Sequence, residues 1–231
     1  MSELQNIVTI DGPSGVGKST VSRKVAAAIG FTYLDTGAMY RAVGWYFLQQ
    51  GIALEETEAI AEKLADVELQ LFPAVDEESD VRVFLNGEDV TMAIRTAEMA
   101  MVASRVSALP VVRRILTEIQ RGYGERGGIV AEGRDTGTVV FPKAAFKFFL
   151  DARPEERAKR RVLQLQARSV AADFNEILKM TLERDLNDSQ RAIAPLKRAE
   201  DAVLIETTER TIPQVVSEIL RVIDSKKNKE R

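Results

Sequence analysis

The chain has 231 residues, of which 45% are hydrophobic and 29% are charged, a composition typical of one globular unit with a sizeable core. The formal net charge of −3 provides no overall attraction to nucleic acid or to an anionic membrane. The sequence has no cysteine and no histidine, which excludes disulfides, thiolate or imidazole metal ligands, cysteine nucleophiles and histidine bases.

The N-terminal sequence, MSELQNIVTID, lacks the basic start and the long apolar stretch of a secretory signal. No apolar run approaches the ~20 residues that a membrane helix needs. We therefore expect a cytoplasmic protein that binds neither a membrane nor a nucleic acid polymer. The lack of a large apolar stripe favours a monomer.

The first elements alternate between strand and helix. Residues 6–10 are apolar and rich in β-branched side chains, which is typical of a buried strand, and residues 18–30 have helical periodicity that ends at a glycine. A second strand is predicted at 31–34 and a second helix at 37–50. This rhythm predicts an α/β fold with a parallel sheet.

The middle of the chain breaks the alternation. Residues 67–72 and 81–90 both have strand patterns, and the Asn86-Gly87 pair is a strong hairpin signal. We interpret residues 63–96 as an antiparallel insertion within a single unit that spans residues 1–231.

The α/β pattern returns in the C-terminal half. Helical segments flank Pro110, and strands are predicted at 128–133, 146–151 and 202–206. An arginine-rich helical stretch runs from Pro154 to about residue 190, and a last helix begins near Pro213.

Residues 12–20, GPSGVGKST, directly follow the first strand and open the first helix. They match the pattern G-x-x-x-x-G-K-[ST], in which glycines let successive backbone amides converge on phosphate oxygens. The helix N-terminus and Lys18 add positive charge, and the Ser19 hydroxyl is a ligand for Mg²⁺. This phosphate-binding loop predicts ATP binding by Gly12, Pro13, Ser14, Gly15, Val16, Gly17, Lys18, Ser19 and Thr20.

Three functional classes share such a loop: phosphotransferases, GTPase switches and nucleotide sensors without turnover. The N-K-x-D and D-x-x-G motifs of a GTPase do not occur in the sequence. A phosphotransferase differs from a sensor in having a second pocket for the phosphate acceptor, so the remaining polar motifs decide between them.

Candidate residues for a second anion site lie at two predicted strand ends. Thr36 and Arg41 follow the second strand, in LDTGAMYR, and Arg134 and Asp135 follow the strand at 128–133. Ligands of open α/β sheets bind at this edge. The alternatives are a helix cap beside a solvated arginine at the first position and a surface ion pair at the second.

The arginine-rich stretch provides a third candidate. Arg157, Arg160 and Arg161 are spaced to share one helix face, and Arg184, Asp188 and Arg191 to share another. Such residues can close over a phosphate-bearing substrate. The alternative is a set of surface ion pairs with Glu155, Glu156 or Glu183.

Taken together, GPSGVGKST, LDTGAMYR, NGEDVT…IR, GRDTGTVVFP and DSQRAIAPLKRAEDA resemble the bacterial cytidylate (CMP) kinases, from Ile7 to Ile223. The resemblance implies a nucleoside monophosphate kinase: a P-loop NTPase core with a five-stranded parallel sheet flanked by helices. It further implies that 63–96 is an acceptor-side insertion and 154–190 a helical lid.

The resemblance also implies roles for individual residues. The acceptor phosphate would be held by Thr36, Arg41 and Arg134. Cytosine would be recognised by Ser104, Arg113, Asp135 and Arg191, and the ribose and phosphate by Arg184 and Asp188. The resemblance alone assigns Ser104 and Arg113, because both lie in unremarkable helical sequence.

The implied reaction is phosphoryl transfer from ATP to CMP or dCMP. The acceptor is already an anion, so no base is required, and catalysis consists of positioning and charge neutralisation. Lys18, Arg134, Arg160 and Arg184 would be catalytic, and Ser19 and Glu132 would serve Mg²⁺. Some family members have serine in place of Thr36 and aspartate in place of Glu132, which keeps the functional group. The alternatives are a small kinase for UMP or another monophosphate, and a nucleotide-binding module without turnover.

Overall fold

A computed structural model of the chain describes residues 6–54, 57–73, 80–167 and 169–229. Five parallel strands form the central sheet in the order β2-β6-β1-β7-β8. Their bounds are β1 Ile7–Asp11, β2 Thr32–Asp35, β6 Ile129–Gly133, β7 Phe146–Asp151 and β8 Val203–Glu206. The predicted α/β fold with a five-stranded parallel sheet is confirmed.

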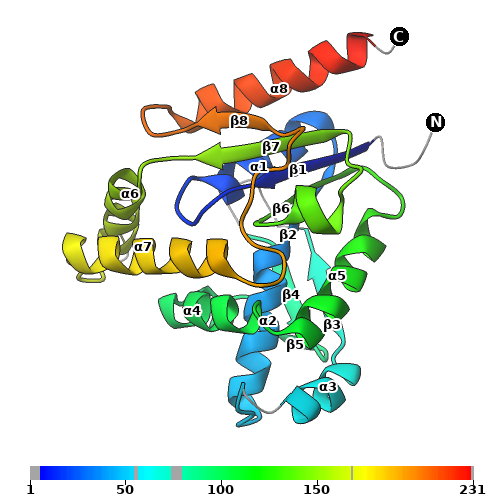
Figure 1. Cartoon of the computed structure of the whole chain (residues 1–231), viewed down its shortest axis with the longest axis vertical. Coiled ribbons are helices and arrows are strands. Elements are labelled where there is room, and N and C mark those ends of the chain that lie inside the picture. The colour runs from blue at the N-terminus through cyan, green and yellow to red at the C-terminus, as the bar shows by residue number, and fades with distance from the viewer. Residues whose placement is uncertain (1–5, 55–56, 74–79, 168, 230–231) are drawn as a thin grey trace.

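Helices cover both faces of this sheet (Figure 1). Their bounds are α1 Lys18–Ile29, α2 Thr36–Gln49, α3 Thr57–Ala65, α4 Ala97–Val106, α5 Pro110–Gly124, α6 Pro154–Gln166, α7 Phe174–Gln190 and α8 Ile212–Lys229. Successive residues of a strand point to opposite faces. Val8 and Val130 therefore pack with α1 and α8, whereas Ile7 and Ile129 pack on the other side with α2 and α5.

The expected antiparallel segment is a three-stranded sheet, β3 Leu69–Phe72, β4 Arg82–Leu85 and β5 Glu88–Asp89. Asn86 and Gly87 connect β4 to β5 with positive φ angles of 50° and 81°, as a tight hairpin turn requires, so the predicted hairpin is confirmed. The Tyr123 hydroxyl of α5 accepts a hydrogen bond from the Leu71 N–H at 3.0 Å and fastens the small sheet to the core.

The stretch expected to be helical from Pro154 to about residue 190 is divided into α6 and α7, with residues 169–173 outside either helix. The two helices pack against each other beside the phosphate-binding loop (Figure 1). Among the residues described, every helix is too short or too polar to span a lipid bilayer.

Strand β1 leads directly into the phosphate-binding loop, and a buried carboxylate at its end anchors the neighbouring turn. Asp11 accepts hydrogen bonds from the Thr136 N–H at 2.9 Å, the Thr136 hydroxyl at 2.7 Å and the Gly137 N–H at 2.7 Å. Burial nevertheless raises the pKa of Asp11. These contacts hold the segment after β6 beside the segment after β1, so residues distant in sequence meet at one edge of the sheet.

Candidate functional site

A cavity of about 650 Å³ opens at the carboxyl ends of β1, β2 and β6. It is bounded by α4, α6 and α7 and by the start of α8. Eight basic and four acidic side chains of the described residues line it, an excess of four positive charges in a chain whose formal net charge is −3. Such local charge attracts anions even though the whole chain does not.

The site residues predicted from the sequence all line this cavity except Gly12 and Pro13. A Cβ atom on Gly12 would lie 2.1 Å from the Leu150 carbonyl oxygen, and its φ of 149° is unfavourable for other residues. The role of Gly12 is therefore to let the chain turn against β7. The phosphate-binding loop, the two strand-end segments and the arginine-rich stretch are far apart in sequence. All of them reach this cavity, as the resemblance requires.

The phosphate-binding loop is folded around its own lysine. Gly17 has a φ of 95° and lets the chain enter α1 at Lys18. The Lys18 ammonium donates to the Pro13 carbonyl oxygen at 2.6 Å and is buried. Burial and the nearby charge of Arg134 lower its pKa well below the usual value. A phosphate beside Lys18 would offset both effects, so the loop favours anionic ligands.

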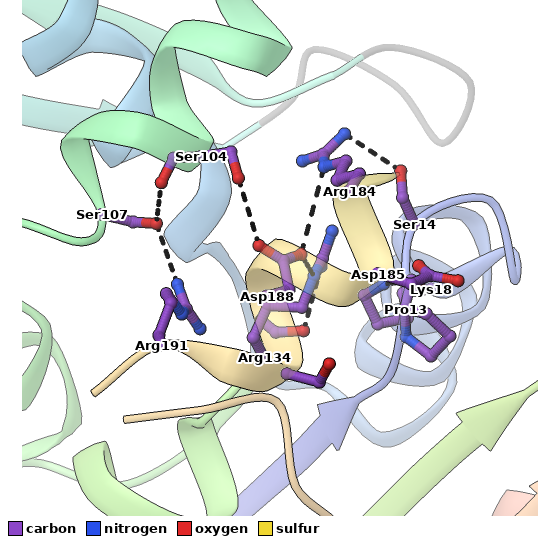
Figure 2. Close-up of polar contacts among 12 residues, drawn as sticks. Pro13, Ser14, Lys18, Ser104, Ser107, Arg134, Arg184, Asp185, Asp188 and Arg191 are labelled. Carbon is purple, nitrogen blue, oxygen red and sulfur yellow. Dashed lines mark hydrogen bonds and ion pairs between the residues drawn. The ribbon is translucent and has the colours of Figure 1, made fainter. Parts of the chain in front are cut away.

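Asp188 is the centre of the polar network on the α7 side of the cavity (Figure 2). It accepts from the Arg134 Nε–H at 2.9 Å and the Ser104 hydroxyl at 3.3 Å, and Arg184 Nε lies 4.0 Å away. Burial opposes ionisation, but the charges of Arg134 and Arg184 outweigh it and lower the pKa of Asp188. One carboxylate thus orders two of the predicted catalytic arginines.

Arg184 connects this network to the phosphate-binding loop. Its guanidinium donates to the Ser14 hydroxyl at 3.1 Å (Figure 2). Burial and the charge of Arg134 lower its pKa to about 10, so it remains a cation at neutral pH. Two guanidinium groups held close together without a counterion of equal charge form a site for phosphate oxygens.

The expectation that Arg191 continues the helical face of Arg184 and Asp188 is wrong, because α7 ends at Gln190 and Arg191 has an extended ψ of 134°. Arg191 nevertheless reaches the cavity and donates to the Ser107 hydroxyl at 2.8 Å and the Ala194 carbonyl oxygen at 2.9 Å. The extended backbone turns its side chain toward α4, beside the base-recognition residues that the resemblance implies.

The deepest part of that region is a buried ion pair. Arg113 of α5 donates to the Asp135 carboxylate and to the Ser107 carbonyl oxygen at 3.0 Å. The Arg113 guanidinium also lies over the Tyr40 ring, 5.6 Å from its centre. Arg113 and Asp135 therefore form a fixed, directional donor and acceptor. Asp135 is paired with Arg113 in the interior and not with Arg134 in a surface pair, which was the alternative.

Arg157 and Arg160 of α6 do not share one environment. Arg157 is buried and donates to the Ser14 carbonyl oxygen at 3.1 Å and to both carboxylate oxygens of Asp185 on α7. Arg160 lines the cavity but donates to the Thr207 carbonyl oxygen at 2.6 Å, and its Nε lies 3.7 Å from Glu156. One helical turn separates an arginine that braces the loop from one that faces the segment after β8.

On the β2 side, Asp35 organises the predicted acceptor-phosphate residues. Its Oδ1 caps α2 through the Ala38 N–H at 2.8 Å, and its Oδ2 accepts from Arg41 at 2.9 Å and from Arg95 at 3.2 Å. Thr36 donates to the Glu132 carbonyl oxygen at 2.6 Å. Burial opposes ionisation of Asp35, but the charges of Arg41 and Arg95 lower its pKa below the ordinary 3.8.

Substitution of Asp35 by asparagine is expected to lower the free energy of unfolding at pH 7 by about 2–3 kcal/mol, because two partly buried arginines lose their carboxylate. A lowered folded-state pKa gives stability that is fully present above the unfolded pKa and lost as pH falls through the folded one. Urea unfolding at a series of pH values should therefore show that the difference in unfolding free energy between Asp35→Asn and the parent protein shrinks below pH 3.8. An equal gap at pH 7 and pH 3 would contradict this role; Asp89→Asn, which breaks an exposed pair with Arg82, is the matched control.

Ser19 and Glu132 fit a magnesium site. The Ser19 hydroxyl donates to Glu132 Oε1 at 2.7 Å, which leaves its oxygen lone pairs free to coordinate a cation. Glu132 Oε2 is buried and has no hydrogen-bond partner among the described residues. Mg²⁺ is bound through one or two oxygen ligands of the protein, retained waters and substrate phosphates. This donor set has that composition.

Several cavity residues were missed by the sequence interpretation. Asp35 lies inside the LDTGAMYR motif and its position before a helix was a usable signal. No local sequence pattern marks the other missed cavity residues, because they reach the cavity only through packing of distant elements. These are Ser107, Thr207 and Arg210.

Comparison with known proteins identifies relatives over nearly the whole chain. The family model described as cytidylate kinase matches residues 8–225. The cytidylate kinase of Syntrophotalea carbinolica is 48% identical over 219 residues, which cover 95% of this chain and 92% of that protein. The bifunctional pantoate ligase/cytidylate kinase of Synechococcus elongatus is 49% identical over 218 residues, or 94% of this chain and 41% of that protein. This chain therefore spans less than half the length of the bifunctional relative.

A solved structure has a similar fold. An uncharacterized protein from Eubacterium ventriosum aligns with a TM-score of 0.53 at 13% identity, covering 96% of this chain and 99% of that chain. At this identity the similarity concerns the fold alone.

Proposed function

Because this chain belongs to the cytidylate kinase family, we propose that it transfers a phosphoryl group from ATP to CMP, and also to dCMP. The observation that carries the proposal is the cavity, in which the phosphate-binding loop faces a second group of arginines and a buried Arg113–Asp135 pair. A nucleotide sensor does not need that second group.

The two phosphate positions follow from the residues that border the cavity. The triphosphate of ATP lies on the loop, with Lys18 beside its terminal phosphates. The phosphate of CMP lies between Thr36, Arg41 and Arg134. Arg134 borders both positions and neutralises charge that is shared between donor and acceptor during transfer.

The chemistry requires positioning and charge neutralisation. An acceptor phosphate is a nucleophile without losing a proton, which agrees with a site built without histidine. Lys18, Arg134 and Arg184 are the proposed catalytic cations, with Arg160 at the α6 side. Mg²⁺, when bound by Ser19 and Glu132, supplies further charge neutralisation at the phosphates.

Base selection is assigned to the buried pair formed by Arg113 of α5 and Asp135, which follows β6. The Asp135 carboxylate accepts a hydrogen bond from the exocyclic amine of cytosine, and Arg113, Ser104 and Arg191 donate to the ring edge. Uracil has a carbonyl oxygen in place of that amine, so its acceptor would face the Asp135 acceptor. A buried mismatch of this kind is penalised strongly.

Two segments are proposed to move when nucleotides bind. Residues 63–96 are the acceptor-side insertion, connected to Asp35 through Arg95, and residues 154–190 are the lid, which carries Arg160 and Arg184. Closure of both over the bound nucleotides would exclude water and prevent hydrolysis of ATP.

A coupled assay of ADP formation tests the reaction. With ATP and Mg²⁺ present, CMP and dCMP are expected to be phosphorylated, and AMP, GMP and UMP to be poor acceptors. Equal turnover of UMP and CMP would identify a kinase with another acceptor range. No ADP with any acceptor would identify a binding module without turnover.

A further inference from the structure

Side chains from two other elements meet at the Glu132 carboxylate. Tyr33 of β2 donates its hydroxyl to Glu132 Oε1 at 2.8 Å, and Ser19 of α1 donates to the same oxygen at 2.7 Å. The strands β2 and β6 are adjacent and parallel, with Tyr33 opposite Val130 and Asp35 opposite Glu132. Tyr33 and Glu132 therefore lie on the same face of the sheet, displaced by two residues along the strands.

The two oxygens of Glu132 have different environments. Oε1 accepts from two hydroxyl groups, whereas Oε2 is buried without a hydrogen-bond partner in the described part of the chain. The side chain belongs to a residue that is only 5% exposed. A buried carboxylate oxygen without a partner is costly unless a ligand completes it.

Tyr33 itself does not border the cavity, whereas Ser19 and Glu132 do. Its ring packs among the apolar side chains of both sheet faces, and its hydroxyl alone reaches the polar site. Any effect of Tyr33 on a ligand must therefore pass through the side chains that its hydroxyl meets, Glu132 first and Ser19 beside it.

We propose that Tyr33 is a positioning residue that orients Glu132 for the Mg²⁺ that accompanies ATP. Two hydroxyl donors on Oε1 fix the rotation of the carboxylate and leave Oε2 available to the cation or to one of its waters. The Ser19 hydroxyl directs its proton at Oε1, so its lone pairs would remain for the cation. Without the Tyr33 hydroxyl, Oε1 keeps one donor and the carboxylate can rotate. The inference rests on the proposed use of ATP, but not on the identity of the acceptor.

Isothermal titration calorimetry of the full chain tests this role without requiring turnover. ATP is titrated with Mg²⁺ present and with EDTA, and the ratio of the two affinities measures the contribution of the metal. Tyr33→Phe is expected to reduce that ratio by about tenfold, as loss of a residue behind a metal ligand commonly does. The affinity for metal-free ATP should stay within about twofold of the parent value, because Tyr33 contacts no loop amide.

Tyr123→Phe is the matched control. It makes the same chemical change, removing a hydroxyl that accepts from the Leu71 N–H on the small sheet. Both affinities should remain at the parent values in this variant, and thermal unfolding should show that both phenylalanine variants retain the fold.

A second comparison uses the Glu132→Ala background. If Tyr33 acts through the carboxylate, adding Tyr33→Phe to Glu132→Ala should not change the ratio further. The inference is overturned by a ratio in Tyr33→Phe equal to that in Tyr123→Phe, by an equal loss of metal-free ATP affinity, or by an additional loss in the Glu132→Ala background. Failure of the proposed reaction would appear instead in the acceptor assay, with the calorimetric ratios unaffected.

Discussion

Replacement of Lys18 by alanine is expected to reduce kcat for CMP phosphorylation by about 10³-fold, equivalent to about 4 kcal/mol of barrier. Lys18 is a buried cation on the phosphate-binding loop, and no other side chain occupies its position beside the Pro13 carbonyl oxygen in the described structure. Charge that develops on the transferring phosphoryl group would therefore lose one of the cations that stabilise it. Steady-state kinetics with saturating ATP and CMP measure the effect.

Lys24→Ala is the control for this variant, because Lys24 lies on the same helix with its side chain exposed. Its kcat should match the parent enzyme. Thermal unfolding of both variants separates a loss of chemistry from a loss of the loop structure that the Lys18–Pro13 hydrogen bond supports. A kcat near the parent value in Lys18→Ala would remove this residue from the mechanism.

Replacement of Asp135 by alanine is expected to lower kcat/KM for CMP by about 10³-fold, because the cytosine amine and the Arg113 guanidinium both lose their buried acceptor. ATP affinity should remain within about twofold, since the loop that binds it is intact. Kinetics with varied CMP and calorimetry with ATP give the two quantities separately. Equal losses in both would refute a role in base recognition.

The control for Asp135→Ala, which leaves the buried Arg113 without its carboxylate, should likewise deprive a buried cation of its carboxylate. Asp201→Ala makes this change elsewhere: it removes a carboxylate, itself 65% exposed, from Lys147, whose side chain is 6% exposed, at a place that does not border the cavity. If both variants lose stability but only Asp135→Ala loses kcat/KM, the kinetic effect belongs to recognition rather than folding.

The loop and the hairpin could be predicted because their information is local. In residues 12–20 the glycines, Lys18 and Ser19 are contiguous, and their order alone determines which amides and side chains can face one phosphate. Asn86 and Gly87 tolerate the positive φ angles of a tight turn whatever surrounds them. The alternation of strand and helix likewise favoured a parallel sheet, because such strands need long crossovers.

The division of the stretch 154–190 and the different roles of its arginines could not be predicted. Helical spacing identifies side chains that share a face, but not what that face contacts. Arg157 was one of three similar arginines in the sequence, and it became a brace of the loop only because α7 places Asp185 beside it, 28 residues later. Arg191 lies one residue beyond the end of α7, so helical spacing does not describe its position relative to Arg184 and Asp188.

The phosphate-binding loop, the α/β pattern and the excluded chemistry can all be derived from the amino-acid sequence, because these depend on residue type and short spacing. The folded arrangement was needed to reveal the long-range pairs: Tyr33 donates to Glu132 across 99 residues, Arg134 donates to Asp188 across 54, and Arg41 pairs with Asp35 rather than with solvent. Such pairs form when the sheet order β2-β6-β1-β7-β8 brings distant strand ends to one edge. Local patterns do not encode that order, since it results from burying both faces of the whole sheet at once.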